Sequence, residues 1–146
     1  MVLAGQGGVA KFIQEGTYKY IPYNKLFRRT EFMEVEGYGR FEGYANRDSL
    51  KYRSVYGLDD VLTLYRGTIR RVGFSRAWNM FVQLGMTDDS YTMDGSDTMS
   101  YRQFTNSFLP YHPTDSVEIK TRLILKIDQD DSMWDKLVEL DLFNPN

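Results

Sequence analysis

A chain of 146 residues, 42% hydrophobic and 26% charged, has the size and composition of one globular domain, which excludes a disordered or fibrous chain. The absence of cysteine excludes disulfides and thiolate chemistry, and the apolar runs are too short to cross a membrane, so we expect a soluble, cytoplasmic protein without a membrane partner. The net charge of -2 is unevenly spread, with 13 Lys and Arg against 8 Asp and Glu in residues 1–86 and 5 against 12 in residues 87–146, which favours a small anionic ligand over nucleic acid.

The first 45 residues have the pattern of β-structure. Residues 11–14 and 17–23 alternate polar and apolar side chains around Glu15-Gly16, which predicts a hairpin with a two-residue turn. Residues 31–36 predict a further strand. Residues 37–44 continue the alternation with glycines that suggest bulges or close backbone approach.

A change of pattern begins at Asn46. The cap-forming side chains of Asn46, Asp48 and Ser49 precede a predicted short helix over residues 50–56, with Gly57 as its end. Residues 62–70 fit a strand or a helix equally well. Residues 74–84 have the apolar spacing of an amphipathic helix that ends at Gly85.

The acidic part of the chain predicts helices. Residues 86–100 are polar and aperiodic, which is typical of a surface connection. Helices are expected over 101–108, 115–127 and 132–142, the second capped by Thr114 or Asp115. The predicted fold class is α+β, with a small mixed or antiparallel sheet from the N-terminal third followed by a helical bundle. The expected division is a sheet portion, 1–45, and a mainly helical portion, 46–146.

Three patterns that suggest ligand chemistry have simpler explanations. Residues 5–10 match the G-x-G-x-x-A dinucleotide fingerprint, but no full strand precedes them and a hairpin turn follows, so we expect a surface turn and no cofactor. Residues 128–139 partly imitate a calcium loop, but Met133 stands where glycine is required, so we expect an acidic helix start and no metal. His112 reads as a surface histidine, with a general base as the alternative.

Arginines near two turns form the strongest candidate site. A guanidinium binds a carboxylate through two hydrogen bonds and stays charged at any working pH. Arg47 lies beside Asn46 and Ser49 at the start of a predicted helix, whose N–H groups would bind the same anion. Arg66, Thr68 and Arg70 share one face if their segment is extended. Composition alone leaves solvated surface arginines as the alternative.

Two linked segments resemble the saccharopine dehydrogenase family, in its glutamate-forming saccharopine reductase branch. Residues 42–49 read EGYANRDS, where the family pattern is E-G-[YF]-P-N-R-D-S. Residues 66–74 read RGTIRRVGF, where the pattern is R-G-T-[LI]-R-Y-x-G-[FY]. Residues 82–86 and 134–143 are similar to later helices of the family, so the resemblance covers nearly the whole chain.

The resemblance implies an enzyme with parts beyond this chain. Such enzymes have a Rossmann domain for NADP or NAD, a mixed α/β domain that binds saccharopine and dimerises, and an inserted helical domain. The sequence looks like the second and third of these. The full enzyme interconverts saccharopine with 2-aminoadipate semialdehyde and glutamate in lysine metabolism. We therefore expect an oxidoreductase fragment that is inactive alone, binds no cofactor itself, and has saccharopine or a related amino-dicarboxylate, the missing Rossmann domain and a second copy of itself as partners.

The resemblance also assigns site residues. The substrate-binding arginine of the family falls on Arg47, and the stretch that contacts the substrate backbone falls on 68–70. With the arginine pattern, the predicted substrate-binding set is Asn46, Arg47, Arg66, Thr68, Ile69 and Arg70, and no catalytic residue is predicted.

Two departures from the family pattern, Ala45 for proline and Arg71 for tyrosine, leave the choice of substrate within the family open. The alternative function is a free-standing anion-binding, interaction or dimerisation module, in which Arg66, Arg70 and Arg71 would contact nucleic acid.

Overall fold

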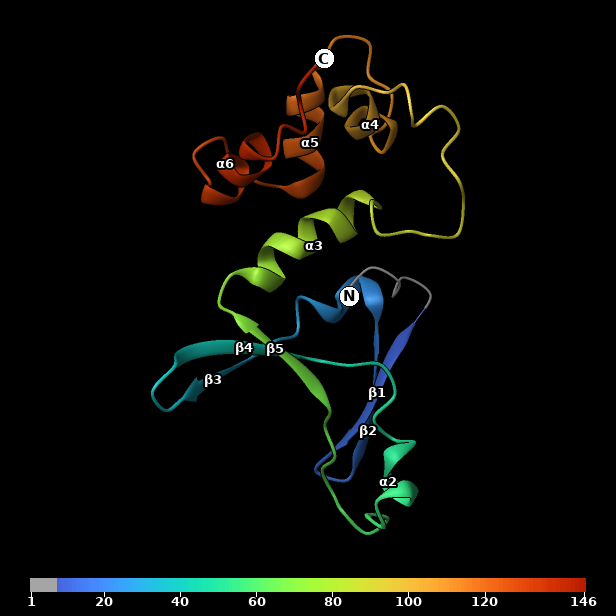
Figure 1. Cartoon of the computed structure of the whole chain (residues 1–146), viewed down its shortest axis with the longest axis vertical. Helices are drawn as coiled ribbons and strands as arrows, with labels where there is room; N and C mark the ends of the chain where they lie inside the picture. Colours follow the sequence, from blue (N-terminus) through green and yellow to red (C-terminus); the bar gives the residue numbers. More distant parts are fainter. Residues whose placement is uncertain (1–7) are drawn as a thin grey trace. The chain divides into compact units, whose positions relative to one another are not determined.

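The computed structural model describes residues 8–146, which divide into two compact units, the first ending at Asn79 and the second being Met80–Asn146 (Figure 1). The first unit holds both sheets, and the second is helical. The predicted α+β class is confirmed. Among the described residues, no helix combines the length and the apolar character that crossing a membrane requires.

The predicted hairpin is present. β1 (Val9–Gln14) pairs antiparallel with β2 (Thr17–Pro22), and Gln14 lies opposite Thr17. Both turn residues have positive φ, 50° at Glu15 and 76° at Gly16, as a tight hairpin turn with the natural strand twist requires. The strand prediction extended one residue too far, because Tyr23 begins the short helix α1 (Tyr23–Leu26), which was not predicted.

A second antiparallel sheet has the order β3-β4-β5. Its strands are β3 (Glu31–Val35), β4 (Gly39–Ala45) and β5 (Gly67–Arg71). β5 decides the ambiguous segment in favour of a strand. The prediction of one sheet drawn from the N-terminal third was wrong in this detail, because the hairpin and the second sheet are separate and β5 comes from later in the chain.

The segment between β4 and β5 fastens the two sheets together. It contains the short helix α2 (Tyr52–Val55), and isolated bridges join Lys11 to Asp48 and Ile13 to Leu64. Because β1 contacts both ends of this segment, inward side chains of β1 and β4 lie in a common core. In this core Phe12 of β1 is 1% exposed and Ala45 of β4 is 4% exposed. This core supports the residues of the candidate site.

α3 (Phe74–Leu84) confirms the predicted amphipathic helix, and Gly85, with φ 83°, ends it. Residues 86–100 form no helix or strand, as predicted. α4 (Tyr101–Ser107), α5 (Val117–Leu125) and α6 (Ser132–Glu139) confirm the three expected helices. The prediction of Thr114 or Asp115 as the cap of α5 was wrong, because the Ser116 side chain accepts the Ile119 N–H.

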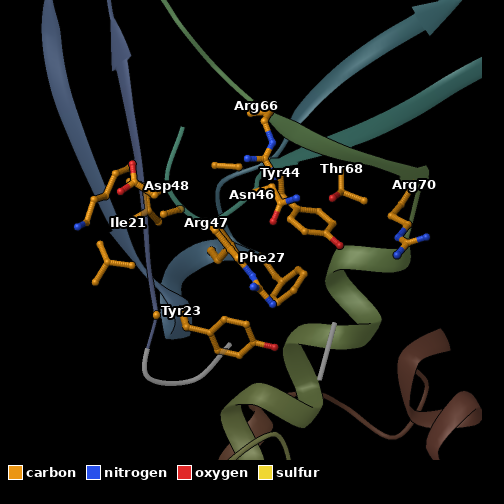
Figure 2. A pocket seen from close by; sticks show the side chains of 16 residues that line it. Ile21, Tyr23, Phe27, Tyr44, Asn46, Arg47, Asp48, Arg66, Thr68 and Arg70 are labelled. Atoms are coloured by element: carbon orange, nitrogen blue, oxygen red, sulfur yellow. The ribbon is translucent and has the colours of Figure 1, made fainter. Parts of the chain in front are cut away.

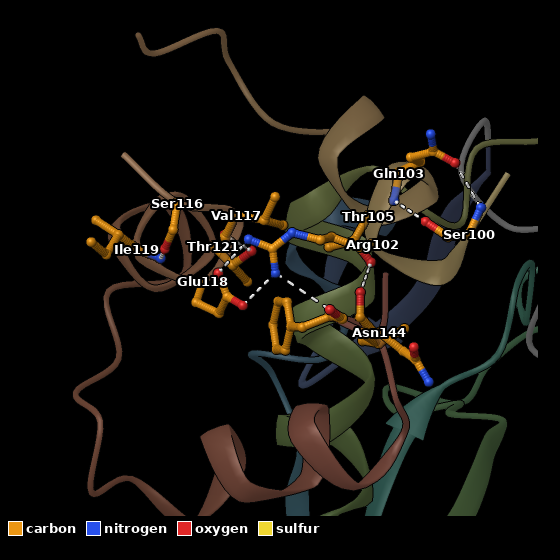
Figure 3. A network of polar contacts seen from close by, with 12 residues as sticks. Ser100, Arg102, Gln103, Thr105, Ser116, Val117, Glu118, Ile119, Thr121 and Asn144 are labelled. Atoms are coloured by element: carbon orange, nitrogen blue, oxygen red, sulfur yellow. Dashed lines mark hydrogen bonds and ion pairs between the residues drawn. The ribbon is translucent and has the colours of Figure 1, made fainter. Parts of the chain in front are cut away.

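The second unit is held by polar contacts as well as by an apolar core around Leu137, which is fully buried. Arg102 in α4 forms an ion pair with Glu118 in α5 at 2.5 Å and donates to the Phe143 carbonyl (Figure 3). The Thr105 hydroxyl donates to the Leu142 carbonyl at 2.7 Å. These contacts connect two helices and the C-terminal segment.

Candidate functional site

The first unit contains a cavity of about 710 Å³ between the hairpin, α1 and the β4-β5 pair (Figure 2). A volume of this order suits a small-molecule ligand. The cavity is lined by Gly8, Val9, Ala10, Lys11, Ile21, Tyr23, Leu26, Phe27, Tyr44, Ala45, Asn46, Arg47, Asp48, Arg66, Thr68 and Arg70.

The structure brings most of the predicted site residues together at this cavity. Asn46, Arg47, Arg66, Thr68 and Arg70 line it. Ile69 does not, since its side chain lies on the opposite face of β5 from Thr68 and is 52% exposed. The sequence left open how the two motifs lie relative to each other. In the structure, residues of both motifs line the same cavity.

Ile69 presents its backbone instead. The Asn46 N–H donates to the Arg66 carbonyl at 2.8 Å, and hydrogen-bonded pairs alternate with non-bonded ones along an antiparallel ladder. By this alternation the Ile69 N–H and carbonyl point away from β4. They lie on the open edge of the sheet, because β5 is the last strand.

The turn that carries Arg47 is fixed by β1. The Lys11 N–H donates to the Arg47 carbonyl at 2.7 Å, and the Ser49 N–H donates to the Lys11 carbonyl at 2.7 Å. An Asp48 carboxylate oxygen accepts the Leu50 N–H at 3.0 Å and closes the turn before α2. The predicted cap cluster thus shapes the turn, although Lys51 and not one of its members occupies the N-cap position of α2.

Ser49 and Gly67 join the two motifs. The Ser49 side chain, 1% exposed, accepts the Arg66 N–H at 3.1 Å. At Gly67 a Cβ atom would lie 2.7 Å from a Tyr65 ring carbon and 2.8 Å from the Tyr44 carbonyl oxygen, so the motif requires glycine here. Ser49 and Gly67 therefore have structural roles within the two motifs.

Arg47 differs from its neighbours. Its φ of 45° is left-handed, a conformation that costs energy in any residue other than glycine and that occurs preferentially at functional sites. Within residues 8–146 its guanidinium is exposed and makes no hydrogen bond or ion pair. In Figure 2 this side chain extends into the cavity toward Phe27. Its charge is available to a ligand.

Arg66 and Arg70 are held by aromatic rings. The Arg66 guanidinium lies over the Tyr52 ring at 4.4 Å, and that of Arg70 lies over the Phe74 ring at 5.0 Å. The buried Nε of Arg70 has no hydrogen-bond partner among the described residues. Both guanidinium groups therefore keep hydrogen-bond donors for a ligand while their orientation is restrained.

The sequence did not predict the contribution of the hairpin and α1. Lys11 and an aromatic wall of Tyr23, Phe27 and Tyr44 line the cavity, with ring centroids of Phe27 and Tyr44 4.9 Å apart. Tyr44 alone carried a signal, because it lies within the EGYANRDS segment. The others reach the site through long-range contacts that spacing along the chain does not reveal.

The cavity is strongly cationic. Lys11, Arg47, Arg66 and Arg70 are among its lining residues, and within the described part of the chain Asp48 is the one acidic lining residue. Tyr65, which precedes the lining residue Arg66 in the sequence, packs edge-on against Phe12, with the two ring centroids 5.0 Å apart. Burial, with a smaller contribution from nearby Glu31 and an opposing one from Arg29, raises the pKa of Tyr65 to about 12, so the phenol adds no negative charge at neutral pH.

The patterns set aside on sequence grounds have the following positions. Of the fingerprint-like residues 5–10, residues 5–7 lie outside the described part of the chain, and Ala10 lies within β1. Asp131 is the N-cap of α6 and accepts the Met133 N–H at 2.8 Å. His112 is exposed, and its Nδ1 lies 3.3 Å from an Asp115 oxygen. Within residues 8–146, no group of at least three His, Cys, Asp or Glu side chains is arranged to hold a metal ion.

Comparison with known proteins gives consistent results. The family model for the saccharopine dehydrogenase C-terminal domain matches residues 1–144. The mitochondrial alpha-aminoadipic semialdehyde synthase of Mus musculus is 56% identical over 45 residues, which cover 31% of this chain and 5% of that protein. Saccharopine dehydrogenase [NADP(+), L-glutamate-forming] of Saccharomyces cerevisiae is 27% identical over 128 residues, or 87% of this chain and 28% of the yeast protein.

A solved structure has the same fold. The apo, histidine-tagged, L-Glu-forming saccharopine dehydrogenase from Saccharomyces cerevisiae aligns with 99% of this chain at a TM-score of 0.73 and 21% sequence identity. The alignment covers 33% of that chain. The present chain thus spans a third or less of these relatives.

Proposed function

The chain belongs to the saccharopine dehydrogenase C-terminal domain family, and from this membership we propose that it is the substrate-binding part of an NAD(P)-dependent saccharopine dehydrogenase. The parent enzyme would interconvert saccharopine with 2-aminoadipate semialdehyde and glutamate, a reaction of lysine metabolism. Because the chain spans 28% of its yeast relative, the remaining part would supply the nicotinamide site, and the chain would be inactive alone.

One observation carries this proposal. Five of the six residues assigned from the two motifs line a single cavity, although the motifs are separated along the chain. Saccharopine is an amino acid with three carboxylates, and the described residues that line the cavity include four cationic ones and one acidic one. The excess of cationic over acidic lining residues supports a ligand with several carboxylates.

The residues have distinct roles in the proposed complex. The guanidinium of Arg47, which makes no hydrogen bond or ion pair with the described residues, binds a carboxylate. Arg66, Thr68 and Arg70 offer donors from the neighbouring strand. The aromatic wall of Tyr23, Phe27 and Tyr44 contacts the methylene groups between the carboxylates. Asn46 holds Arg66 through its backbone and adds an amide side chain to the cavity.

The nicotinamide cofactor, NADP or NAD, supplies the hydride in the parent enzyme. We assign it no contacts on this chain. The residues of the chain bind and orient the substrate, and the strained, exposed position of Arg47 is arranged before the ligand arrives.

Calorimetric titration of the 146-residue chain tests the proposal. Saccharopine is expected to bind saturably and more tightly than lysine, which lacks the additional carboxylates. The alternative, a nucleic-acid module that uses Arg66, Arg70 and Arg71, predicts instead binding to duplex DNA that weakens steeply with salt. DNA binding without saccharopine binding would replace the proposal with this alternative.

We also propose that the chain forms a homodimer, as the family resemblance implies. β5 is an edge strand, and Ile69 and Val72 beside its open edge are 52% and 51% exposed, which supports a contact there. Sedimentation equilibrium of the chain distinguishes a dimer from a monomer. A monomer at all accessible concentrations would contradict self-association of this chain.

A further inference from the structure

We propose that Glu42 is a positioning residue for the Arg70 side of the cavity, an inference that rests on the proposed carboxylate site. Glu42 lies in β4 and does not line the cavity. Its side chain is only 4% exposed, and one carboxylate oxygen accepts the Ser75 N–H at 2.6 Å. Ser75 is the second residue of α3, so the carboxylate holds the start of this helix.

The position of this carboxylate calls for a functional explanation. A buried charge is costly unless it is well paired, and an apolar side chain of similar volume often gives equal or greater stability. The Ser75 N–H and the positive end of the α3 dipole offset part of this cost for Glu42. The contact fixes where α3 begins.

The first residue of α3, Phe74, connects this contact to the cavity. The Arg70 guanidinium lies over the Phe74 ring, 5.0 Å from the ring centroid. The ring also stacks on Tyr44 with centroids 6.3 Å apart and an interplanar angle of 10°. Tyr44 and Arg70 both line the cavity. Glu42 therefore sets the position of a ring that supports two of the lining side chains.

The same contact keeps Arg70 available. Glu42 lies directly opposite Arg70 in the β4-β5 register, so the two side chains are on one face of the sheet. An acidic and a basic residue in such a pair normally attract each other, yet within residues 8–146 they form no ion pair. The carboxylate is engaged by α3, and the buried Arg70 Nε has no protein partner in the described part of the chain. The donors of Arg70 are left for a ligand carboxylate.

Two conservative variants separate the hydrogen bond from the charge. Glu42→Gln keeps the length of the side chain and an oxygen that accepts the Ser75 N–H. Glu42→Asp keeps the charge but is one methylene shorter. In calorimetric titrations of the full chain with saccharopine, we expect Glu42→Gln to stay within about twofold of the wild type and Glu42→Asp to bind about tenfold more weakly. Ser75→Ala is the matched control, because the Ser75 hydroxyl makes no hydrogen bond with any described residue and the backbone N–H is retained.

A double-mutant cycle distinguishes positioning from general destabilisation. The effect of Glu42→Asp is expected to become clearly smaller when Arg70 is already alanine, with only the part transmitted through Phe74 to Tyr44 left, and to persist in full when Arg47 is alanine. Equal losses for Asp and Gln, or a Glu42→Asp effect that is unchanged in the Arg70→Ala background, would overturn the role of Glu42. If Arg47→Ala weakens binding and Arg70→Ala does not, the Glu42 inference fails while the proposed function stands. Absence of saccharopine binding in the wild-type chain overturns both.

Discussion

Arginines serve different purposes in neighbouring parts of the first unit. Arg53 is engaged by the protein, since its guanidinium donates to the Tyr18 hydroxyl at 3.0 Å and to the Val61 carbonyl at 3.3 Å. Arg47 has no such partner among the described residues and adopts a left-handed backbone conformation. A guanidinium that makes no hydrogen bond or ion pair within residues 8–146, on a residue with a strained backbone, agrees with the ligand-binding role proposed for Arg47.

Arg47→Ala is therefore expected to weaken saccharopine binding by about 2 kcal/mol, the typical loss of a hydrogen bond to a charged group. The unfolding temperature should change little, because no internal contact of the guanidinium is lost. Calorimetry and thermal unfolding measure the two effects separately. Arg71→Ala is the control, since Arg71 lies on the other face of β5, over Phe41 at 4.7 Å, and should leave binding unchanged. Wild-type affinity in the Arg47 variant would remove this residue from the site.

Gly67 gives a stability prediction within the same motif. A Cβ atom there meets the Tyr65 ring at 2.7 Å and the backbone oxygen of Tyr44 at 2.8 Å, so Gly67→Ala should cost roughly 1 to 3 kcal/mol of unfolding free energy through overpacking. Gly43→Ala is the comparison, because its closest contact, at 2.9 Å, is the flexible end of Met33, which can move aside. Urea denaturation measures both, and a smaller loss at Gly67 than at Gly43 would contradict the steric explanation.

At the scale of elements, local patterns predicted most of the secondary structure. The Glu15-Gly16 turn was sufficient to predict the hairpin, and the apolar spacing of 74–84 was sufficient to predict α3, because the contacts that stabilise these elements are close in sequence. α1 was missed, since its four residues continue an apolar strand pattern. Residues 62–70 were ambiguous because pairing with β4, a tertiary contact, decides their conformation. The N-cap of α5 was assigned to Thr114 or Asp115 and not to Ser116, because all three residue types are suitable caps and they are adjacent in sequence.

The sequence predicted the cavity residues that belong to the two motifs but missed those that come from the hairpin and α1. Arg47 and Arg70 came from motif resemblance, and their shared cavity is a property of the fold. Lys11 and Tyr23 were missed because the hairpin reaches the 46–49 turn through an isolated bridge at Lys11 and Asp48. Such a bridge between distant segments has no periodic signature in the sequence.

The contact between α4 and α5 predicts a pH dependence. The Arg102 hydrogen bond, opposed by burial and aided by smaller hydrogen bonds, lowers the pKa of Glu118 from 4.5 to about 2. A lowered folded-state pKa stabilises the fold above pH 4.5, and this contribution is lost as the pH falls toward 2. The pair is about one-third exposed, so we expect about 1 kcal/mol.

Glu118→Gln should therefore have a lower free energy of unfolding than the wild type near neutral pH. This difference in stability should shrink as the pH falls from 4.5 toward 2. Urea denaturation at several pH values measures it. Glu139→Gln, an exposed charge in α6, is the control and should show no such convergence. A difference between Glu118→Gln and the wild type that is independent of pH would exclude the ion pair as its cause.

At the scale of the whole molecule, the uneven charge corresponds to the division into two units. The cavity and its cationic residues belong to Met1–Asn79, whereas the acidic part of the sequence forms the helices of Met80–Asn146. The described residues that line the cavity all lie between Gly8 and Arg70 in the sequence. The uneven charge of the sequence is therefore consistent with the proposed anion site in the first unit, although the net charge of the chain is only -2.

The most direct test is amide-resolved NMR of the 146-residue chain during titration with saccharopine. The account predicts saturable shifts concentrated at Asn46, Arg47, Thr68, Ile69 and Arg70, because these backbone groups surround one cavity or adjoin it. The same titration of Arg47→Ala should need a higher ligand concentration. Saturable shifts confined to other segments, or none in the wild type, would contradict a carboxylate site built from these two motifs.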